Sequence, residues 1–368
     1  MTRTIVVKIG TSSITAGNGE LAVEKMSNII AQLGELQRSG RWRPVLVSSG
    51  AVTAGLNRLG WTRSRMTMPE KQAAAAVGQS LLMDMYASLF HNEGMTIGQI
   101  LLTREDVEDR QRFVHIRNTM MTLMENDIIP IVNENDTVAI DEIRFGDNDT
   151  LGALVSLVCE AKYLILLTDI DGLYAGNPKL NAAAKRLTDI WDITDDVVKL
   201  AGGAGTAGGT GGMRTKIAAA RIATASGTDV VVASATEPDV LQRVLQQEPI
   251  GTVFHAKENR LRKRKAWLLH GSRIEGRLSI DAGAADAICV LSGSLLMPGV
   301  REVSGEFQAG AVVEIMGENG VLAHGIVNFS SADLKALLER RRSAETLRKL
   351  QEVVHRNDMV LMEGESKS

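Results

Sequence analysis

Residues 4–13 read TIVVKIGTSS and hold the pattern from which the fold can be inferred. A β-branched apolar run ends at Lys8 and passes at once into glycine and hydroxyl side chains. Backbone N–H groups that converge after a strand, with an ammonium group beside them, suit an anion. A lysine at a strand end is more often only solvated, so the rest of the chain must support this interpretation.

The same kind of run recurs through about residue 255 and alternates with longer helical patterns, which predicts parallel βα units. The predicted strands are 4–9, 44–48, 97–101, 128–133, 163–167 and 230–233. Several are apolar without alternation, as expected for strands covered by helices on both faces. Pro69 suits the first turn of a long alanine-rich helix. We therefore predict an α/β fold, an α/β/α sandwich with an open, mainly parallel sheet that binds ligands at the carboxyl ends of its strands.

The pattern changes after His255. Residues 257–265 read KENRLRKRK, six basic against one acidic, which is typical of a solvated linker. Short strands punctuated by glycine and asparagine then predict a small β-barrel-like domain. These strands are 277–280, 287–291, 312–316 and 321–323. Ser330 and Asp333 are spaced for the capping box of a terminal helix. The predicted organisation is a first domain at 1–256, a basic linker at 257–274, a second domain at 275–355 and a C-terminal tail at 356–368.

Composition excludes several classes of protein. The 368 residues have a net charge of −3, so the chain as a whole has no basic field to attract nucleic acid or an anionic membrane. Cys159 and Cys289 lie far apart in apolar runs, and we expect two buried thiols and no disulfide or metal pair. No apolar run approaches the ~20 residues of a membrane-spanning helix, and the first residues lack the apolar core of a signal peptide. We expect a cytoplasmic protein.

Three further segments follow predicted strands. Residues 48–52 read SSGAV, where a strand enters a helix and free N–H groups can hold a phosphate or carboxylate. Residues 132–136 and 144–149 read VNEND and RFGDND, a polar set that can grip an ammonium group, order lysines or hold Mg²⁺-bound phosphate. Residues 166–174 (LLTDIDGLY) pair with a run from Gly202 to Gly212 that has seven glycines in eleven residues. That run leads through residues 213–216 (MRTK) into an alanine-rich helix, which favours a phosphate clamp but does not match the P-loop pattern.

In this order and spacing the segments resemble the glutamate 5-kinase family of amino acid kinases. The resemblance rests on KIGTS at 8–12, SGA at 49–51, NEND at 133–136, GDND at 146–149, LTD at 167–169 and TGGM at 210–213. Residues 294–300 (SLLMPGV) and 323–325 (AHG) resemble a PUA domain, a module appended to many members of this family. The resemblance therefore spans nearly the whole chain.

The resemblance implies ATP-dependent phosphorylation of the glutamate γ-carboxylate, the first step towards proline, with Mg²⁺ bound to the nucleotide and no protein metal ligand assigned. It implies proline as a feedback inhibitor and a homo-oligomer, either dimer or tetramer. The implied catalytic residues are Lys8, Lys216 and Asp149. The implied glutamate ligands are Ser49, Asp136 and Asn148, with Asn133 in support. The implied ATP site is Lys8, Thr168, Asp169, Thr210, Gly211, Gly212, Met213, Arg214, Thr215 and Lys216.

Two alternatives stay open. One is another amino acid kinase, acting on acetylglutamate, aspartate, carbamate or UMP, against which the NEND and GDND segments and the PUA-like part argue. The other is an RNA-binding protein. Residues 275–330 contain two basic and seven acidic residues, so this part offers few phosphate contacts, although the basic linker keeps the idea alive.

Overall fold

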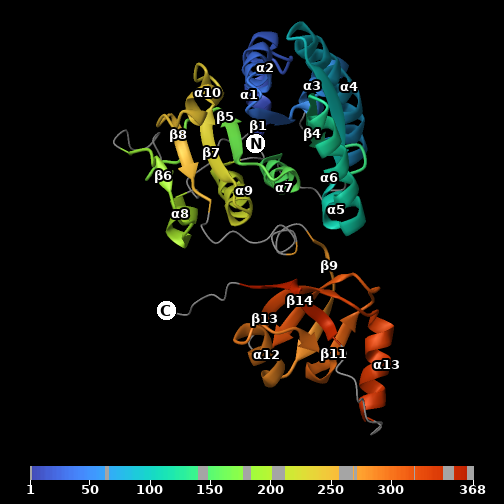
Figure 1. The fold of residues 1–368 in the computed structure, drawn as a ribbon. Helices are drawn as coiled ribbons and strands as arrows, with labels where there is room; N and C mark the ends of the chain where they lie inside the picture. The colour runs from blue at the N-terminus through green and yellow to red at the C-terminus, as the bar shows by residue number, and fades with distance from the viewer. Residues whose placement is uncertain are drawn as a thin grey trace. The chain divides into compact units, whose positions relative to one another are not determined.

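The computed structural model describes residues 2–62, 66–139, 148–176, 184–200, 212–256, 268, 272–318, 320–342 and 352–362. The chain divides into two compact units, residues 1–260 and 261–368 (Figure 1). No helix in the described ranges is both long and apolar enough to cross a membrane.

The first unit is built on an eight-stranded sheet with the order β3-β4-β2-β1-β5-β7-β8-β6. Its strands are β1 (Arg3–Ile9), β2 (Trp42–Val47), β3 (Thr96–Leu102), β4 (Ile128–Glu134), β5 (Tyr163–Thr168), β6 (Asp189–Ile190), β7 (Asp229–Ser234) and β8 (Gly251–Phe254). Neighbours from β3 through β7 are parallel, and β7 pairs antiparallel with β8. All six predicted strands of this unit are present, and the mainly parallel sheet is confirmed. The short strands β8 and β6, the last two in the sheet order, were not predicted.

Helices cover both faces of this sheet (Figure 1). They are α1 (Thr11–Ile14), α2 (Val23–Arg38), α3 (Ala51–Leu59), α4 (Met68–Asn92), α5 (Arg104–Glu108), α6 (Arg110–Glu125), α7 (Asn148–Cys159), α8 (Asp195–Leu200), α9 (Met213–Ala225) and α10 (Val240–Leu245). Side chains of β1 alternate between two apolar cores. Val6 packs in the core that contains α7 and α9 residues, and Val7 packs in the core that contains α2 and α4 residues. Because side chains alternate along a strand, Lys8 shares the α7 face with Val6.

Helix α4 starts as its sequence predicts. The Thr67 backbone N–H donates to Glu70 Oε2 at 2.7 Å, and a proline lies in the first turn. This helix packs backbone to backbone against α3. A Cβ added to Gly78 would lie 1.8 Å from the Ala51 carbonyl oxygen, and one added to Gly55 would lie 1.8 Å from that of Ala74. Only glycine permits this approach, which fixes α4 beside the loop that begins α3.

The second unit is a six-stranded sheet with the order β10-β14-β13-β12-β9-β11. Its elements are β9 (Ile274–Ile280), α12 (Ala282–Cys289), β10 (Leu295–Leu296), a 3₁₀ turn (Met297–Gly299), β11 (Val300–Gly305), β12 (Val312–Gly317), β13 (Gly320–Val327), α13 (Ser331–Arg342) and β14 (Glu352–Leu361). The predicted capping box is confirmed, because Ser330 Oγ donates to Asp333 Oδ2 at 2.6 Å and accepts from the Asp333 N–H at 3.2 Å. Leu334 is fully buried in the core of this unit.

The prediction of a strand at 287–291 is wrong, because most of that segment belongs to α12. The Asp281 side chain accepts from the Ala284 N–H at 2.8 Å and caps this helix. Four alanines between 282 and 287 favour the helix, and they outweigh the two β-branched residues that follow. The expectation that Cys289 is buried is also wrong, since its thiol is exposed, whereas Cys159 is buried as predicted.

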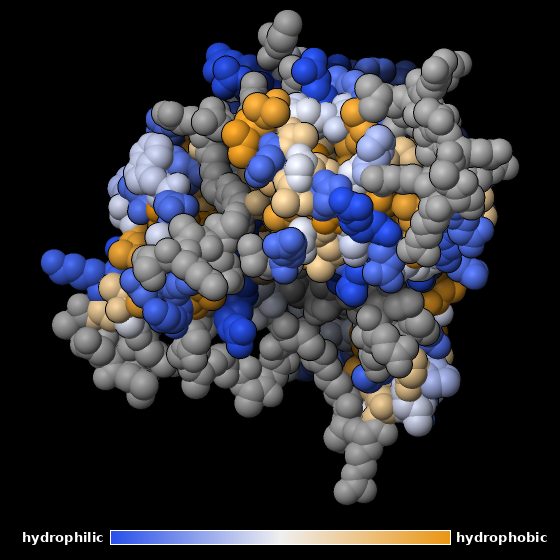
Figure 2. Space-filling view, turned by 90° about the horizontal axis from the view of Figure 1, so that it is seen from below, coloured by the Kyte–Doolittle hydropathy of each residue, from blue (hydrophilic) through white to orange (hydrophobic). Residues whose placement is uncertain are grey.

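Two boundaries of the second unit differ from the predicted domain ends. Strand β9 begins at Ile274, inside the predicted linker, and β14 continues to Leu361, past residue 355. Leu361 pairs with Ala323 of β13, and Met359 and Val360 are buried. Apolar burial and pairing thus extend the sheet into the segment that sequence alone predicts to be a tail. Figure 2 shows exposed hydrophobic residues in small groups among hydrophilic ones on the face in view.

Candidate active site

Four parallel strands of the first unit end at one edge of the sheet, next to the segments selected from the sequence. After β1 comes Gly10, after β2 come Ser48 and Ser49, after β4 comes Asp136, and after β5 comes Asp169. The strand register places Lys8 level with Val47 of β2 and Leu166 of β5. The predicted location, at the carboxyl ends of the strands, is where these residues lie.

A buried cluster of three charges lies at this edge. Lys8 Nζ is 2.6 Å from Asp149 Oδ1, and Lys216 Nζ is 3.1 Å from Asp149 Oδ2. The exposed fractions are 6% for Lys8, 0% for Asp149 and 3% for Lys216. These residues come from β1, α7 and α9, so the fold joins segments from three distant parts of the chain. The cluster carries one more positive than negative charge, which suits an anionic group brought next to it.

Asp149 stays ionised within this cluster. Burial alone would raise the pKa of its carboxyl group, but the charges of Lys8 and Lys216 and the hydrogen bonds from Lys8 and Thr215 lower the pKa below its usual value. Thr215 Oγ1 lies 2.8 Å from Asp149 Oδ2 and 2.7 Å from the Gly212 carbonyl oxygen. Its single proton serves one acceptor at a time. The resemblance implied Thr215 as a nucleotide ligand, and the structure places its hydroxyl against the Asp149 carboxylate.

A second cluster, beside the first along α7, consists of neutral groups. Asn148 Nδ2 lies 2.5 Å from the Ser48 carbonyl oxygen, 3.0 Å from Ser49 Oγ and 3.0 Å from Asn133 Oδ1. The structure thus brings together three of the predicted glutamate ligands. Asp136, the fourth, is half-buried in the turn that follows β4. Two residues behind this cluster, both on α4, were not predicted from the sequence. Gln79 accepts from Asn133 Nδ2 at 2.8 Å, and the Tyr86 hydroxyl is 2.9 Å from Ser48 Oγ.

The loop between β2 and α3 has a conformation that requires glycine. Gly50, the residue before α3, has φ +94°, in the left-handed region. A Cβ there would also lie 2.9 Å from Ile14 Cδ1. Ser49 therefore sits at a sharp strand-to-helix turn. The first N–H groups of a helix have no partner within the helix, so they are suited to meet an anion.

The predicted nucleotide residues lie on two segments. Thr168 ends β5, is buried, and donates to Asp169 Oδ1 at 3.1 Å, while Asp169 itself is exposed. Gly212 caps the N-terminus of α9, where Met213 and Arg214 begin the helix. Free N–H groups at such a terminus favour phosphate. Thr210 and Gly211 lie outside the described residues, as do Gly146 and Asp147 of the GDND segment.

The loop after β5 contacts Thr252 of β8 and the side chain of Arg186. Gly172 has φ +144°, and a Cβ there would lie 2.5 Å from Thr252 Oγ1. The Tyr174 hydroxyl lies 3.0 Å from both carboxylate oxygens of Asp171, and Arg186 Nη1 is 3.0 Å from Asp171 Oδ2. These contacts hold in place the segment that starts with Thr168.

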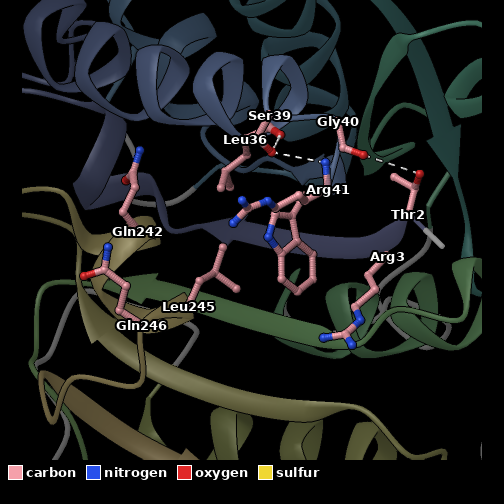
Figure 3. A pocket seen from close by; sticks show the side chains of 10 residues that line it. Thr2, Arg3, Leu36, Ser39, Gly40, Arg41, Gln242, Leu245 and Gln246 are labelled. Carbon is pink, nitrogen blue, oxygen red and sulfur yellow. Dashed lines mark hydrogen bonds between the residues drawn. The ribbon is translucent and has the colours of Figure 1, made fainter.

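A cavity of about 680 Å³ lies elsewhere in this unit and is lined by Thr2, Arg3, Leu36, Ser39, Gly40, Arg41, Trp42, Gln242, Leu245 and Gln246 (Figure 3). Arg3 and Trp42 are the first residues of β1 and β2, so the cavity is at the amino ends of these strands. It contains none of the residues selected from the sequence.

Comparison with known proteins agrees with this geometry. A model of the amino acid kinase family matches residues 3–234, and a PUA domain model matches residues 276–350. Glutamate 5-kinase from Moorella thermoacetica is 44% identical over 365 residues, 98% of this chain and 96% of the relative. The chain belongs to the glutamate 5-kinase family.

Other members of the family match over the same length. Glutamate 5-kinase from Carboxydothermus hydrogenoformans is 42% identical over 98% of each chain, and that from Shewanella oneidensis is 44% identical over 98% of each. Among solved structures, a UMP kinase from Ureaplasma parvum has a TM-score of 0.49 at 14% identity and covers 69% of this chain and 99% of its own. Family membership thus rests on the sequence relatives and the two domain models.

Proposed function

We propose that this protein transfers the γ-phosphoryl group of ATP to the γ-carboxylate of L-glutamate. The observation that carries the proposal is the buried pair of lysines on Asp149, between the neutral Asn148 cluster and the N-terminus of α9. A glutamate carboxylate is already ionised at pH 7, since its ordinary pKa is about 4.3, so the reaction needs no general base. The chemical difficulty is to bring one anion to another.

Lys8 and Lys216 address this difficulty. Their ammonium groups neutralise the transferred phosphoryl group while charge develops on the leaving oxygen, and they do so in a site shielded from water. Asp149 holds both lysines at fixed positions without needing to accept a proton. Because the cluster is formed before substrate arrives, little reorganisation is needed as the charge moves.

Substrate recognition is assigned to the second cluster together with Asp136, which lies in the turn after β4. Ser49, Asn148 and Asp136 are assigned to glutamate, with Asn133 behind them. The Asp136 carboxylate suits the α-ammonium group of the amino acid, and the N–H groups after Ser49 suit a carboxylate. Thr168, Asp169 and residues 210–216 are assigned to ATP, so that the phosphates meet the N-terminus of α9.

Magnesium is assigned to the nucleotide. Lysines and a threonine occupy both oxygens of Asp149, and the described ranges contain no group of three acidic, histidine or cysteine side chains that could hold a metal. Such a site fits a Mg²⁺ ion held mainly by phosphate oxygens and water. When bound, the ion supplies positive charge to the β- and γ-phosphates.

The family resemblance supports three further proposals. Proline inhibits the enzyme at a site that overlaps the glutamate site, where Asp136 suits the amino group of either molecule. The chain forms a homo-oligomer, and it works in the cytoplasm.

The test is an ADP-release assay of the full chain with ATP, Mg²⁺ and one acceptor at a time. Glutamate should give the highest kcat/KM, and acetylglutamate, aspartate and UMP should give little. A clear preference for one of the other three acceptors would overturn the assignment of glutamate. Activity with none of them would argue against the kinase itself.

A further inference from the structure

Helix α4 carries a pair of polar side chains that the reaction as described does not use. Gln79 and Tyr86 are seven residues apart, so they share one face of the helix. Gln79 is half-buried and Tyr86 is fully buried. Burial raises the pKa of the Tyr86 hydroxyl to about 12, in spite of its hydrogen bond with Ser48, so the hydroxyl is neutral near pH 7.

These side chains close a ring of hydrogen bonds through the neutral cluster. From Gln79 the ring passes to Asn133 (2.8 Å), then to Asn148 (3.0 Å), then to the Ser48 carbonyl oxygen (2.5 Å). It returns to α4 through Ser48 Oγ and the Tyr86 hydroxyl, 2.9 Å apart. The ring is therefore anchored on α4 at two points, Gln79 and Tyr86.

Backbone groups fix the direction of each amide in the ring. The Glu134 N–H can only donate, and it donates to Asn133 Oδ1 at 2.9 Å. The other end of Asn133, Nδ2, must then donate, and its acceptor is Gln79 Oε1. The Ser48 carbonyl oxygen can only accept, so the atom of Asn148 that faces it is Nδ2.

This order of donors leaves a particular atom of Asn148 for the substrate. Its Nδ2 has two protons and three acceptors within 3.0 Å, so that end of the amide is saturated. Its Oδ1 has no donor among the residues that the structure describes. A carbonyl oxygen accepts hydrogen bonds from an ammonium group, which is the group that distinguishes an amino acid from a plain dicarboxylate.

We propose that Gln79 and Tyr86 are positioning residues that hold the Asn148 amide with its oxygen towards the α-ammonium group of the substrate, and that they thereby set the preference for a free amino acid. This inference rests on the proposed function. Asn133 has an exposed fraction of only 2%, so without Gln79 its Nδ2 would be a buried donor with no partner. Asn133 would then turn away to find one and release Asn148.

The close packing of α3 on α4 gives the ring a rigid support. Gly78 precedes Gln79 and touches the backbone of Ala51, two residues after Ser49. The helix that holds Gln79 is thus set directly against the loop that supplies Ser49. A rigid support is needed because small displacements of positioning groups weaken binding and catalysis.

The test compares glutamate with glutarate, which has the same chain length and lacks the ammonium group. In the Gln79→Leu variant we expect kcat/KM for glutamate to fall on the order of tenfold, while the kcat/KM for glutarate and the KM for ATP stay near the wild-type values. If phosphorylation of glutarate is too slow to follow, its inhibition constant against glutamate replaces it. The ratio of kcat/KM for glutamate to kcat/KM for glutarate is the glutamate-to-glutarate ratio. The Gln79→Glu variant keeps an acceptor at this position and should retain the wild-type value of this ratio within about threefold.

A matched control comes from a structural glutamine of the same unit. Gln32 is 4% exposed, and its Oε1 accepts from the Leu241 N–H at 2.9 Å, far along the chain from the ring. Gln32→Leu should lower the melting temperature and leave the glutamate-to-glutarate ratio unchanged. If Gln79→Leu does not fold, Tyr86→Phe removes a single hydroxyl from the ring and should reduce the ratio in the same direction.

Three outcomes would overturn the proposal. They are an unchanged ratio in Gln79→Leu, an unchanged ratio in Tyr86→Phe where that variant replaces it, and an equal fall of the ratio in Gln32→Leu. These outcomes differ from a failure of the proposed function, because that failure would appear as a wild-type enzyme that does not phosphorylate glutamate.

Discussion

The two clusters at the edge of the first sheet are neighbours through α7 and yet are built differently. Asn148 and Asp149 are adjacent, but one belongs to a set of amides and hydroxyls and the other to a buried set of full charges. Amides and hydroxyls bind a substrate in its ground state by direction and shape. Buried charges act most strongly where charge moves, in the transition state. The comparison therefore predicts that the charged cluster governs kcat and the neutral cluster governs the KM for glutamate.

The largest effect is expected at the lysines. Lys8→Ala and Lys216→Ala should each lower kcat by a factor of about 10² or more, with a much smaller rise in the KM for glutamate, because each removes a charge that meets the phosphoryl group. Steady-state kinetics with ATP and glutamate measures both constants. A near-normal kcat in either variant would show that the replaced lysine does not neutralise the transferred phosphoryl group.

The next largest effect is expected on the stability of the Asp149→Asn variant, and this effect depends on pH. Asp149→Asn leaves two buried ammonium groups without a counter-charge, and we expect a loss of stability of about 3 kcal/mol at pH 7. The folded-state pKa of this carboxyl is lowered. Its stabilising contribution is therefore complete above the ordinary value of about 3.9 and is lost as the pH falls through the folded-state pKa.

Thermal unfolding of both proteins at a series of pH values measures this dependence. The difference in melting temperature between wild type and Asp149→Asn should be constant from pH 7 to about pH 5 and should shrink below about pH 4. A difference that already shrinks between pH 7 and pH 5 would contradict a lowered pKa for Asp149.

A smaller effect, on binding alone, is expected at Asp136. Asp136→Asn should raise the KM for glutamate on the order of tenfold and leave the KM for ATP unchanged, because one charge opposite the ammonium group is lost. The same variant should respond less to proline. An equal loss of ATP affinity would show that the assignment of Asp136 to the glutamate site is wrong. Undiminished inhibition by proline would indicate that proline binds at a separate site.

The smallest effect on chemistry is expected from the second unit. A chain that ends near residue 262 should fold and phosphorylate glutamate with a kcat within about threefold of the full chain, since every assigned residue lies between Lys8 and Lys216 and the first unit has its own cores. Circular dichroism and kinetics check this. A folded truncation without activity would show that the second unit shapes the active site.

Sequence patterns predicted the first unit well because its strands are buried on both faces and read as continuous apolar runs. They failed where helix and strand preferences compete within one short segment. At residues 287–291 the alanines and the Asp281 cap outweigh two β-branched side chains. Strands β6 and β8, of two and four residues, are too short to show a clear sequence pattern. The β14 residues after 355 were missed for a related reason, since their order depends on pairing with β13.

The candidate site, like the fold, was predicted from the sequence only in part. Lys8, Asp149 and Lys216 were predicted together through the resemblance to a known family, and the ion pairs at Asp149 join them. Gln79 and Tyr86 were not found, because a glutamine and a tyrosine in an alanine-rich helix have no spacing that distinguishes them from other helix residues. Their role depends on a ring of contacts across four segments, and only the fold brings those segments together.

We propose that the lysine pair on Asp149 drives phosphoryl transfer to a carboxylate. The most direct measurement is to trap the product with hydroxylamine, which converts an acyl phosphate to a hydroxamate, in wild type and in Lys216→Ala. We predict ATP-dependent formation of glutamyl hydroxamate by the wild type and a rate lower by a factor of about 10² or more in the variant at saturating glutamate. ATP consumption by the wild type with glutamate but no hydroxamate, or equal rates in the two proteins, would contradict the claim.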